Sequence, residues 1–289
     1  MFELHVKPCL KSHAEAISEH LEAHGALAVT LVDGEDEPIL EPGPGETPLW
    51  EYAVAEALYP DKIAAETAWK ALLLDYPDLS HVLKPIADQD WLRASIADIK
   101  PLQFGKNLWV CPSSEAPPEP DAINIILDPG LAFGTGTHPT TSLCLTWLDS
   151  TEVQDKLVID YGCGSGILAL AALKLGARLA YAVDLDEQAL IATESNAEKN
   201  HISMQMLLLS QPEVLDTPVE ILLANILLTP LLDLHARFEV LLKSGGILVL
   251  SGVLATQVEQ LLKVYAAPTW RHQETCYEDE WALVVFQKI

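Results

Sequence analysis

One segment of this chain, an apolar strand followed by three alternating glycines and then a helix, constrains the possible folds most strongly. It reads Val158-Ile-Asp-Tyr-Gly-Cys-Gly-Ser-Gly166. From here to the C-terminus, strand patterns alternate with helical ones, which is typical of a mainly parallel, doubly wound sheet with helices on both faces. The sequence therefore predicts an α/β, Rossmann-like domain. Its expected strands are 157–161, 180–184, 205–209, 219–224, 247–252 and 281–287, and its expected helices are 167–175, 187–200, 231–242 and 255–266.

The first 88 residues follow a different order, namely strand, helix, strand, strand, helix, strand. This order predicts an α+β domain of the ferredoxin-like type. Ser12 and Glu15 have the spacing of a capping box, and Asp61 is placed to cap the second helix. Residues 112–120 are rich in proline and serine, as linkers are. We therefore expect a small domain over 1–88, a linker over 89–120 and the α/β domain over 121–289.

Charge excludes one large group of functions. Among 289 residues, 42 are acidic and 17 are Lys or Arg, so the net charge is −25. Nucleic acids and anionic membranes are bound through clustered Lys and Arg, which such a surface lacks. Residues 1–100 alone hold 19 acidic and 7 basic side chains, so the small domain is the more acidic per residue. This acidity is either a solvated face or a docking surface for a basic partner.

The cysteine pattern and the absence of apolar runs indicate a cytoplasmic protein. The five cysteines lack C-x-x-C spacing, which argues against a disulfide framework and a zinc ribbon. The N-terminus does not resemble a secretory signal, and no run of about 18 apolar residues could span a bilayer. His20 and His24 lie one helical turn apart, but the neighbouring Glu19 and Glu22 indicate a solvated helix face. We therefore expect no metal site.

The glycine segment and a later aspartate predict a nucleoside site. Gly162, Gly164 and Gly166 would let a ligand lie directly on the backbone, although a tight strand-to-helix turn alone can also require glycine. Asp184, at the end of the next strand, is placed to accept both hydroxyls of a ribose. The dinucleotide fingerprint is G-x-G-x-x-G. Counted from Gly162, its sixth position is Ile167 in this chain and not glycine. The G-x-G-x-G spacing favours S-adenosylmethionine, whose ammonium group Asp160 could attract.

Two other segments offer residues for the same site. The loop from Asp128 to Thr141 precedes a helix and lacks the G-K-[ST] ending of a phosphate loop, but its Phe133 offers a flat face to adenine or to a substrate chain. His138 in this loop is either a proton acceptor or a packing residue. Asn225 ends an apolar strand, where its carbonyl could accept a hydrogen bond from a substrate amine. Its alternative role is to cap the strand end.

Together these motifs resemble those of bacterial methyltransferases that modify protein L11 of the large ribosomal subunit. The resemblance covers nearly the whole chain. It rests on Asp128–Thr141, the G-C-G-S-G turn, Ala224–Leu227, Gly43–Trp50 and Trp109–Pro112. The chain departs from the family pattern at Ser95 and Ser114, where the family often has tryptophan. Both departures lie near the expected junction of the two domains.

The resemblance implies a class I S-adenosylmethionine-dependent methyltransferase domain behind a ferredoxin-like substrate-recognition domain. It implies trimethylation of lysine ε-amines and of the N-terminal α-amine of L11. The family's cofactor-contacting positions match Thr141, Gly162, Asp184 and Asn225. The implied partner is L11 free of the ribosome, with no direct contact to nucleic acid, and the enzyme is expected to be a monomer.

The expected chemistry is direct displacement of the sulfonium methyl group by a neutral amine, with Asn225 orienting the amine and water taking the proton. Three rival functions share parts of the pattern. A nicotinamide dehydrogenase would also use the glycine turn and Asp184. A nucleic-acid methyltransferase would share the catalytic domain, but the charge and the sequence Asn-Ile-Leu after the strand argue against it. A non-catalytic binding module would leave Asp160, Asp184 and Asn225 without a purpose.

Overall fold

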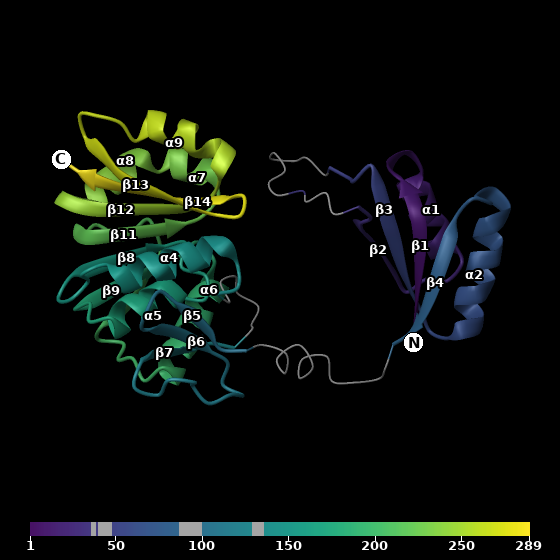
Figure 1. The fold of residues 1–289 in the computed structure, drawn as a ribbon, viewed down its shortest axis with the longest axis horizontal. Helices are drawn as coiled ribbons and strands as arrows, with labels where there is room; N and C mark the ends of the chain where they lie inside the picture. Colours follow the sequence, from purple (N-terminus) through teal and green to yellow (C-terminus); the bar gives the residue numbers. More distant parts are fainter. Residues whose placement is uncertain (36–38, 40–47, 87–99, 129–135) are drawn as a thin grey trace. The chain divides into compact units, whose positions relative to one another are not determined.

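The chain forms two compact units, Met1–Asp90 and Trp91–Ile289 (Figure 1). The computed structural model describes residues 1–35, 39, 48–86, 100–128 and 136–289. Within these ranges, no helix has both the length and the apolar character needed to cross a membrane. Each unit has a hydrophobic core of its own, so each is described separately.

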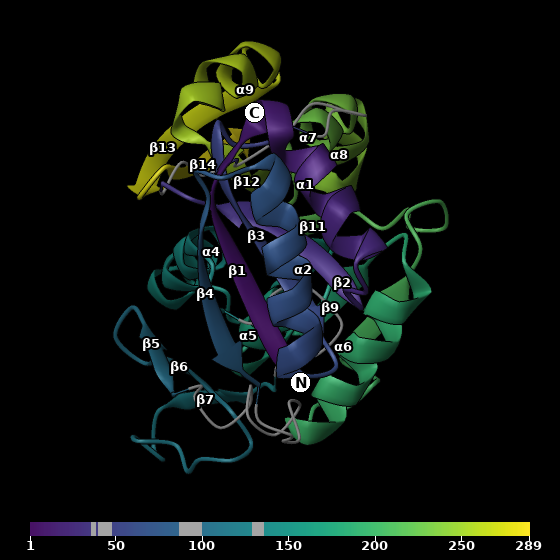
Figure 2. The same ribbon diagram turned by 90° about the vertical axis from the view of Figure 1, so that its right-hand side faces the viewer.

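The first unit is an antiparallel sheet with two helices on one face. Its strand order is β2-β3-β1-β4, and Figure 2 shows both helices side by side over the strands. Alternate strand residues, such as Leu4 and Val6, are buried beneath the helices together with Ile17 and Trp69. The ferredoxin-like order predicted from the sequence is confirmed. Its elements are β1 (Phe2–Leu10), α1 (Lys11–Ala23), β2 (Ala28–Asp33), β3 (Tyr52–Tyr59), α2 (Lys62–Asp75) and β4 (Ser80–Pro85).

The two predicted helix caps of this unit have opposite outcomes. Asp61 caps α2, because its Oδ1 accepts a hydrogen bond of 2.9 Å from the Ala64 amide. The capping box predicted at Ser12 is wrong. α1 begins two residues earlier, after Leu10, so Ser12 lies inside the first turn and cannot act as the cap.

The second unit contains a seven-stranded sheet of order β10-β9-β8-β11-β12-β14-β13. Neighbouring strands from β10 to β12 are parallel, and β14 is antiparallel to both β12 and β13. The strand order reverses between β8 and β11, which is the switch point where such sheets bind ligands. The predicted doubly wound fold is confirmed. Its strands are β8 (Leu157–Tyr161), β9 (Leu179–Val183), β10 (Leu207–Ser210), β11 (Val219–Asn225), β12 (Leu242–Leu254), β13 (Trp270–Glu278) and β14 (Trp281–Lys288).

Helices cover both faces of this sheet. Ile221 and Leu223 of β11 belong to the core beneath α4, α5 and α6, whereas Leu222 and Ala224 belong to the core beneath α7, α8 and α9. Burial on both faces explains the continuous apolar runs of the central strands. The helices are α4 (Pro139–Ser150), α5 (Ile167–Lys174), α6 (Glu187–Lys199), α7 (Leu228–Asp233), α8 (His235–Leu241) and α9 (Val258–Val264), which follows a 3₁₀ turn, Ala255–Gln257.

The expected linker over 89–120 contains regular structure. Strands β5 (Leu102–Phe104), β6 (Leu108–Cys111) and β7 (Ile123–Ile126) form a three-stranded sheet that belongs to the second unit. Leu108 and Cys111 are fully buried, so these residues are part of the core and do not form a free connection. The division between the units lies at 90/91. The single helix expected over 231–242 is divided at Leu234 into α7 and α8.

Candidate active site

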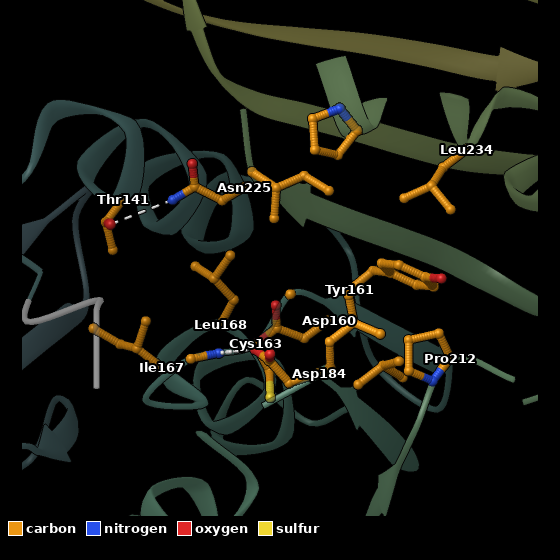
Figure 3. Close-up of a pocket in the computed structure, with 16 residues that line it drawn as sticks. Thr141, Asp160, Tyr161, Cys163, Ile167, Leu168, Asp184, Pro212, Asn225 and Leu234 are labelled. Carbon is orange, nitrogen blue, oxygen red and sulfur yellow. Dashed lines mark hydrogen bonds between the residues drawn. The ribbon is translucent and has the colours of Figure 1, made fainter. Parts of the chain in front are cut away.

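A cavity of about 340 Å³ lies at the carboxyl ends of β8, β9 and β11, beside the switch point of the sheet (Figure 3). Side chains from α4 and α5 complete one side of it, and residues near α7 complete the other. The described residues that line it are Thr141, Asp160, Tyr161, Gly162, Cys163, Gly164, Ile167, Leu168, Val183, Asp184, Leu185, Pro212, Asn225, Ile226, Pro230 and Leu234.

The glycine turn forms the floor where β8 ends. Gly162, Gly164 and Gly166 all have positive φ values, of 78°, 53° and 78°. The amides of Gly162 and Cys163 donate to the carbonyl of Val183, at 2.7 and 3.0 Å, which ties the turn to β9. Gly162 and Gly164 line the cavity, and their contact with a ligand stays a prediction. Gly166 instead begins α5 and packs against Thr193, where a Cβ would not fit.

Asp160 places a carboxylate in the cavity wall although the residue is only 1% exposed. Its Oδ2 accepts a hydrogen bond of 3.0 Å from the Ala169 amide, in the first turn of α5. Burial raises the pKa of Asp160 to about 7, with a further increase from the negative charge of Asp184, while the Ala169 hydrogen bond works in the opposite direction. A buried carboxylate with a raised pKa favours a positively charged ligand beside it.

Asp184 presents a second carboxylate at the end of β9. Its Oδ1 accepts from the Asp186 amide and its Oδ2 from the Gly164 amide, both at 3.0 Å. The bond from Gly164 fixes the carboxylate against the glycine turn (Figure 3), and the bond from Asp186 holds its other oxygen. Each oxygen keeps a further lone pair, so the pair of oxygens can accept two neighbouring hydroxyl groups.

Asn225 and Thr141 come from different elements and meet at one side of the cavity. Asn225 is the last residue of β11, and its Nδ2 donates to Oγ1 of Thr141 at 3.4 Å (Figure 3). Thr141 lies in the first turn of α4 and is almost fully buried. The bond uses the amide nitrogen, which leaves Oδ1 of Asn225 as an acceptor for a ligand.

The structure brings together six of the predicted site residues: Thr141, Asp160, Gly162, Gly164, Asp184 and Asn225. Phe133 and Ser95 lie outside the described residues, and Ser114 is an exposed turn residue.

His138 has a structural position at the start of α4. Its Nδ1 accepts from the Thr140 amide as the helix cap, and its ring packs edge-on against Trp281 at 4.8 Å. Burial lowers its pKa. His20 and His24 stack on each other in the first unit, 4.2 Å apart. In the part of the chain that the structure describes, no three His, Cys, Asp or Glu side chains are grouped so that they could hold a metal ion.

The cavity also has an apolar wall that the sequence patterns did not predict. Pro212 lies in a loop, Pro230 in α7, and Leu234 between α7 and α8. All three line the cavity with Tyr161, and Figure 3 shows Tyr161, Pro212 and Leu234 at one end of it. Arg237 of α8 donates hydrogen bonds to the carbonyls of Pro212 and Leu215, which holds the loop in place. Pro230 and Leu234 resemble ordinary helix residues in the sequence, so no local signal identifies them.

A doubly wound sheet with this strand order, an antiparallel strand inserted beside β12, and a carboxylate-bearing cavity at the switch point defines a class I methyltransferase. A family model described as ribosomal protein L11 methyltransferase (PrmA) matches residues 1–289. The chain belongs to this family, so the resemblance inferred from its motifs is confirmed.

Individual relatives agree with this assignment. The ribosomal protein L11 methyltransferase of Legionella pneumophila (strain Corby) is 51% identical over 285 residues, covering 99% of this chain and 98% of that protein. The protein of the same name from Nitrosococcus oceani is 50% identical over 254 residues, covering 87% of each. A crystal structure of ribosomal protein L11 methylase from Lactobacillus delbrueckii subsp. bulgaricus superposes with a TM-score of 0.61 at 30% identity, covering 66% of this chain and 99% of that chain.

Proposed function

We propose that this chain transfers methyl groups from S-adenosylmethionine to lysine ε-amines and to the N-terminal α-amine of ribosomal protein L11, up to the trimethylated state. The observation that carries the proposal is the meeting of Asp160, Asp184 and Asn225 around one cavity at the switch point. The family assignment supports the reaction and the substrate. We further propose that the enzyme acts in the cytoplasm, as a monomer, on L11 that is free of the ribosome.

The residues of the cavity fit this cofactor by their chemistry. Asp160 is a buried carboxylate with a raised pKa, so a nearby cation would stabilise its ionised form. The ammonium group of the cofactor is such a cation. Asp184 has the two oxygens needed to accept both ribose hydroxyls. The apolar wall at Pro212 and Leu234 suits a flat, weakly polar ring. When bound, S-adenosylmethionine would supply an activated methyl group and a positive charge near the amine.

Asn225 is the residue we assign to positioning the amine. In the first two transfers its Oδ1 would accept an N–H of the neutral amine, which aims the nitrogen lone pair at the methyl carbon; the neutral dimethylamine of the third transfer has no N–H and would be positioned by the cavity wall. In each transfer the lone pair would form the new N–C bond as the C–S bond breaks. After the first and second transfers the product ammonium would pass a proton to water, and after the third the trimethylammonium product has no N–H proton to lose. Thr141 holds the amide in the required orientation through the hydrogen bond from Nδ2. Correct positioning of two reactants contributes several kcal/mol to such a displacement, about 7–11 at most.

The amine must be neutral before it reacts. A lysine of ordinary pKa, about 10.4, costs roughly 4–5 kcal/mol to deprotonate at pH 7. Desolvation in the cavity and the positive charge of the bound cofactor would lower the pKa of the amine. His138 is engaged as the cap of α4 and packs on Trp281, so we assign the proton to water and not to this ring.

Charge supports a basic protein as the substrate. Residues 1–100 have a net charge of −12, and the ferredoxin-like unit is the part that we assign to substrate recognition. An acidic surface attracts a basic ribosomal protein and disfavours nucleic acid.

The variant Asn225→Ala tests the assigned role. We expect its affinity for S-adenosylmethionine, measured by calorimetry, to stay within a few-fold, while transfer of labelled methyl groups to L11 falls about 100-fold, as expected when one reactant is misplaced. Thr141→Val should lose less methyl-transfer activity, because it removes only the hydrogen bond that orients the Asn225 amide. Thr141→Ser keeps the hydroxyl group and should have near-normal activity. Turnover of Asn225→Ala close to that of the parent enzyme would refute the assignment.

A further inference from the structure

The ferredoxin-like unit contains a cavity of its own, with a volume of about 310 Å³. It lies where β1 continues beyond its pairing with β4, which ends at Lys7 and Ser80. The pairing of β1 with β3 shifts between Val6 and Cys9 and then continues to Leu10, so this end of β1 stays in the sheet through β3. The residues that line the cavity come from β1, from α1, from the last residue of α2 and from the loop between α2 and β4. They are Pro8, Leu10, His13, Ile17, Asp75, Tyr76, Pro77, Asp78 and Leu79.

This cavity has an apolar floor and a negatively charged rim. Ile17 is buried and, with Leu79, gives the floor its apolar character. The ring of Tyr76 lies 5.6 Å from the ring of His13, so one side of the cavity is aromatic. Asp75 and Asp78 are exposed and carry the negative charge. Asp75 is also the last residue of α2, a 14-residue helix whose C-terminal carbonyls add partial negative charge.

We propose that this cavity receives a lysine or arginine side chain of the basic protein substrate and so acts as a recognition subsite apart from the methyl-transfer cavity. The proposal rests on the proposed function. An alkyl stem can lie on the apolar floor while the cationic head meets the carboxylates and the face of Tyr76. The volume, at the lower limit of ligand cavities of about 300–1,000 Å³, suits one side chain.

Other occupants fit this cavity less well. An anion would meet two carboxylates and the negative end of α2. A purely apolar side chain would cover Asp75 or Asp78 without pairing it, which costs free energy. His20 lies near the rim, with Nδ1 at 3.6 Å from Asp75 Oδ2, but this contact is longer than a hydrogen bond and leaves Asp75 66% exposed. A cationic group from a partner can therefore reach the carboxylate.

The first experiment measures steady-state methylation of L11 by the full chain and two double variants of equal charge change. Asp75→Asn with Asp78→Asn removes the negative rim, whereas Glu15→Gln with Glu22→Gln removes two exposed charges of α1 that do not line the cavity. We expect the rim variant to raise KM for L11 at least about five-fold with kcat unchanged, and the α1 variant to change KM less than about two-fold. Equal increases in both variants would overturn the proposal, because overall charge alone would then explain them.

The second experiment does not depend on the identity of the substrate. Nα-acetyl-lysine methylamide is titrated into the ¹⁵N-labelled full chain, and the chemical shifts of the backbone amides are followed by NMR. The norleucine analogue is the uncharged control. We expect amide shifts at Tyr76, Asp78 and Leu79 with the lysine compound, and their loss in the rim variant. Absence of these shifts, or equal shifts with norleucine, would overturn the cavity assignment. If the enzyme fails to methylate L11 but the lysine shifts occur, the proposed function fails and the cationic subsite stands.

Discussion

Asp160 is the group on which the pH dependence of cofactor binding should depend. In the ligand-free chain its pKa is about 7, so about half of the molecules carry the charge at pH 7, about nine-tenths at pH 8 and about one-tenth at pH 6. A cationic ligand selects the ionised form, and its apparent Kd varies inversely with the fraction of that form. The apparent Kd for S-adenosylmethionine should therefore be about ten-fold higher at pH 6 than at pH 8, and Asp160→Asn should remove this dependence.

Ionisation of Asp160 at higher pH, which should strengthen cofactor binding, should lower the stability of the ligand-free chain. The folded-state pKa of Asp160 is raised above an ordinary aspartate value near 3.9, so its contribution to stability is full below that value and is lost as pH rises through about 7. Three pKa units correspond to roughly 4 kcal/mol. The amide of Asn can still accept from Ala169, but its new N–H groups need partners, at a cost of about 1–3 kcal/mol. Asp160→Asn should therefore raise the free energy of unfolding of the ligand-free chain at pH 8 by about 1–3 kcal/mol.

Calorimetric titrations at pH 6, 7 and 8 and urea unfolding at pH 8 test both expectations. Asp186→Asn is a suitable control, because this exposed residue caps α6 and asparagine keeps a capping oxygen. The control should retain the ten-fold pH dependence. Wild-type affinity that is constant from pH 6 to 8, or an Asp160→Asn variant that is less stable than the parent at pH 8, would refute the reasoning.

Three further predictions concern other parts of the enzyme. Gly252→Ala should destabilise the chain by about 2–3 kcal/mol in urea unfolding and reduce turnover, because φ is +82° there and a Cβ would meet the backbone of Ile226, next to Asn225. A neutral outcome would refute this packing. His138→Asn, which keeps a capping oxygen, should retain turnover within about two-fold at pH 8, and a hundred-fold loss would identify His138 as the proton acceptor. Raising salt should increase KM for L11 and leave cofactor affinity nearly unchanged; a parallel loss of both would contradict the docking role of residues 1–100.

The parts of the fold that were predicted well are those in which local pattern and burial agree. The strand 157–161 matches the observed β8, because both faces of the strand are buried and the glycine turn defines its end. The edge strand β13 was missed because most of its side chains are exposed, so apolar alternation is absent from Trp270 to Glu278. β5 and β6 were missed because each is very short and they precede a proline-rich segment.

The residues of the candidate site also divide into those that a local sequence pattern predicts and those that it does not. The sequence could predict that Asp160, Asp184 and Asn225 lie together, because each lies within one residue of the end of a predicted parallel strand, and such ends meet at one edge of the sheet. Gly166 shared the glycine pattern, yet its lack of a side chain makes room for Thr193. Pro212, Pro230 and Leu234 reach the cavity only through the tertiary arrangement of a loop, α7 and the junction between α7 and α8, which no local pattern specifies.

The most direct test of the central claim is incubation of the purified chain with methyl-labelled S-adenosylmethionine and the separated ribosomal proteins, followed by mass spectrometry of intact proteins and their peptides. We expect label on L11, in steps of one methyl group up to three on each target amine, at lysine ε-amines and at the N-terminal α-amine. Asn225→Ala should give almost no label in the same assay. Label on RNA or on a small molecule with none on L11 would contradict the claim.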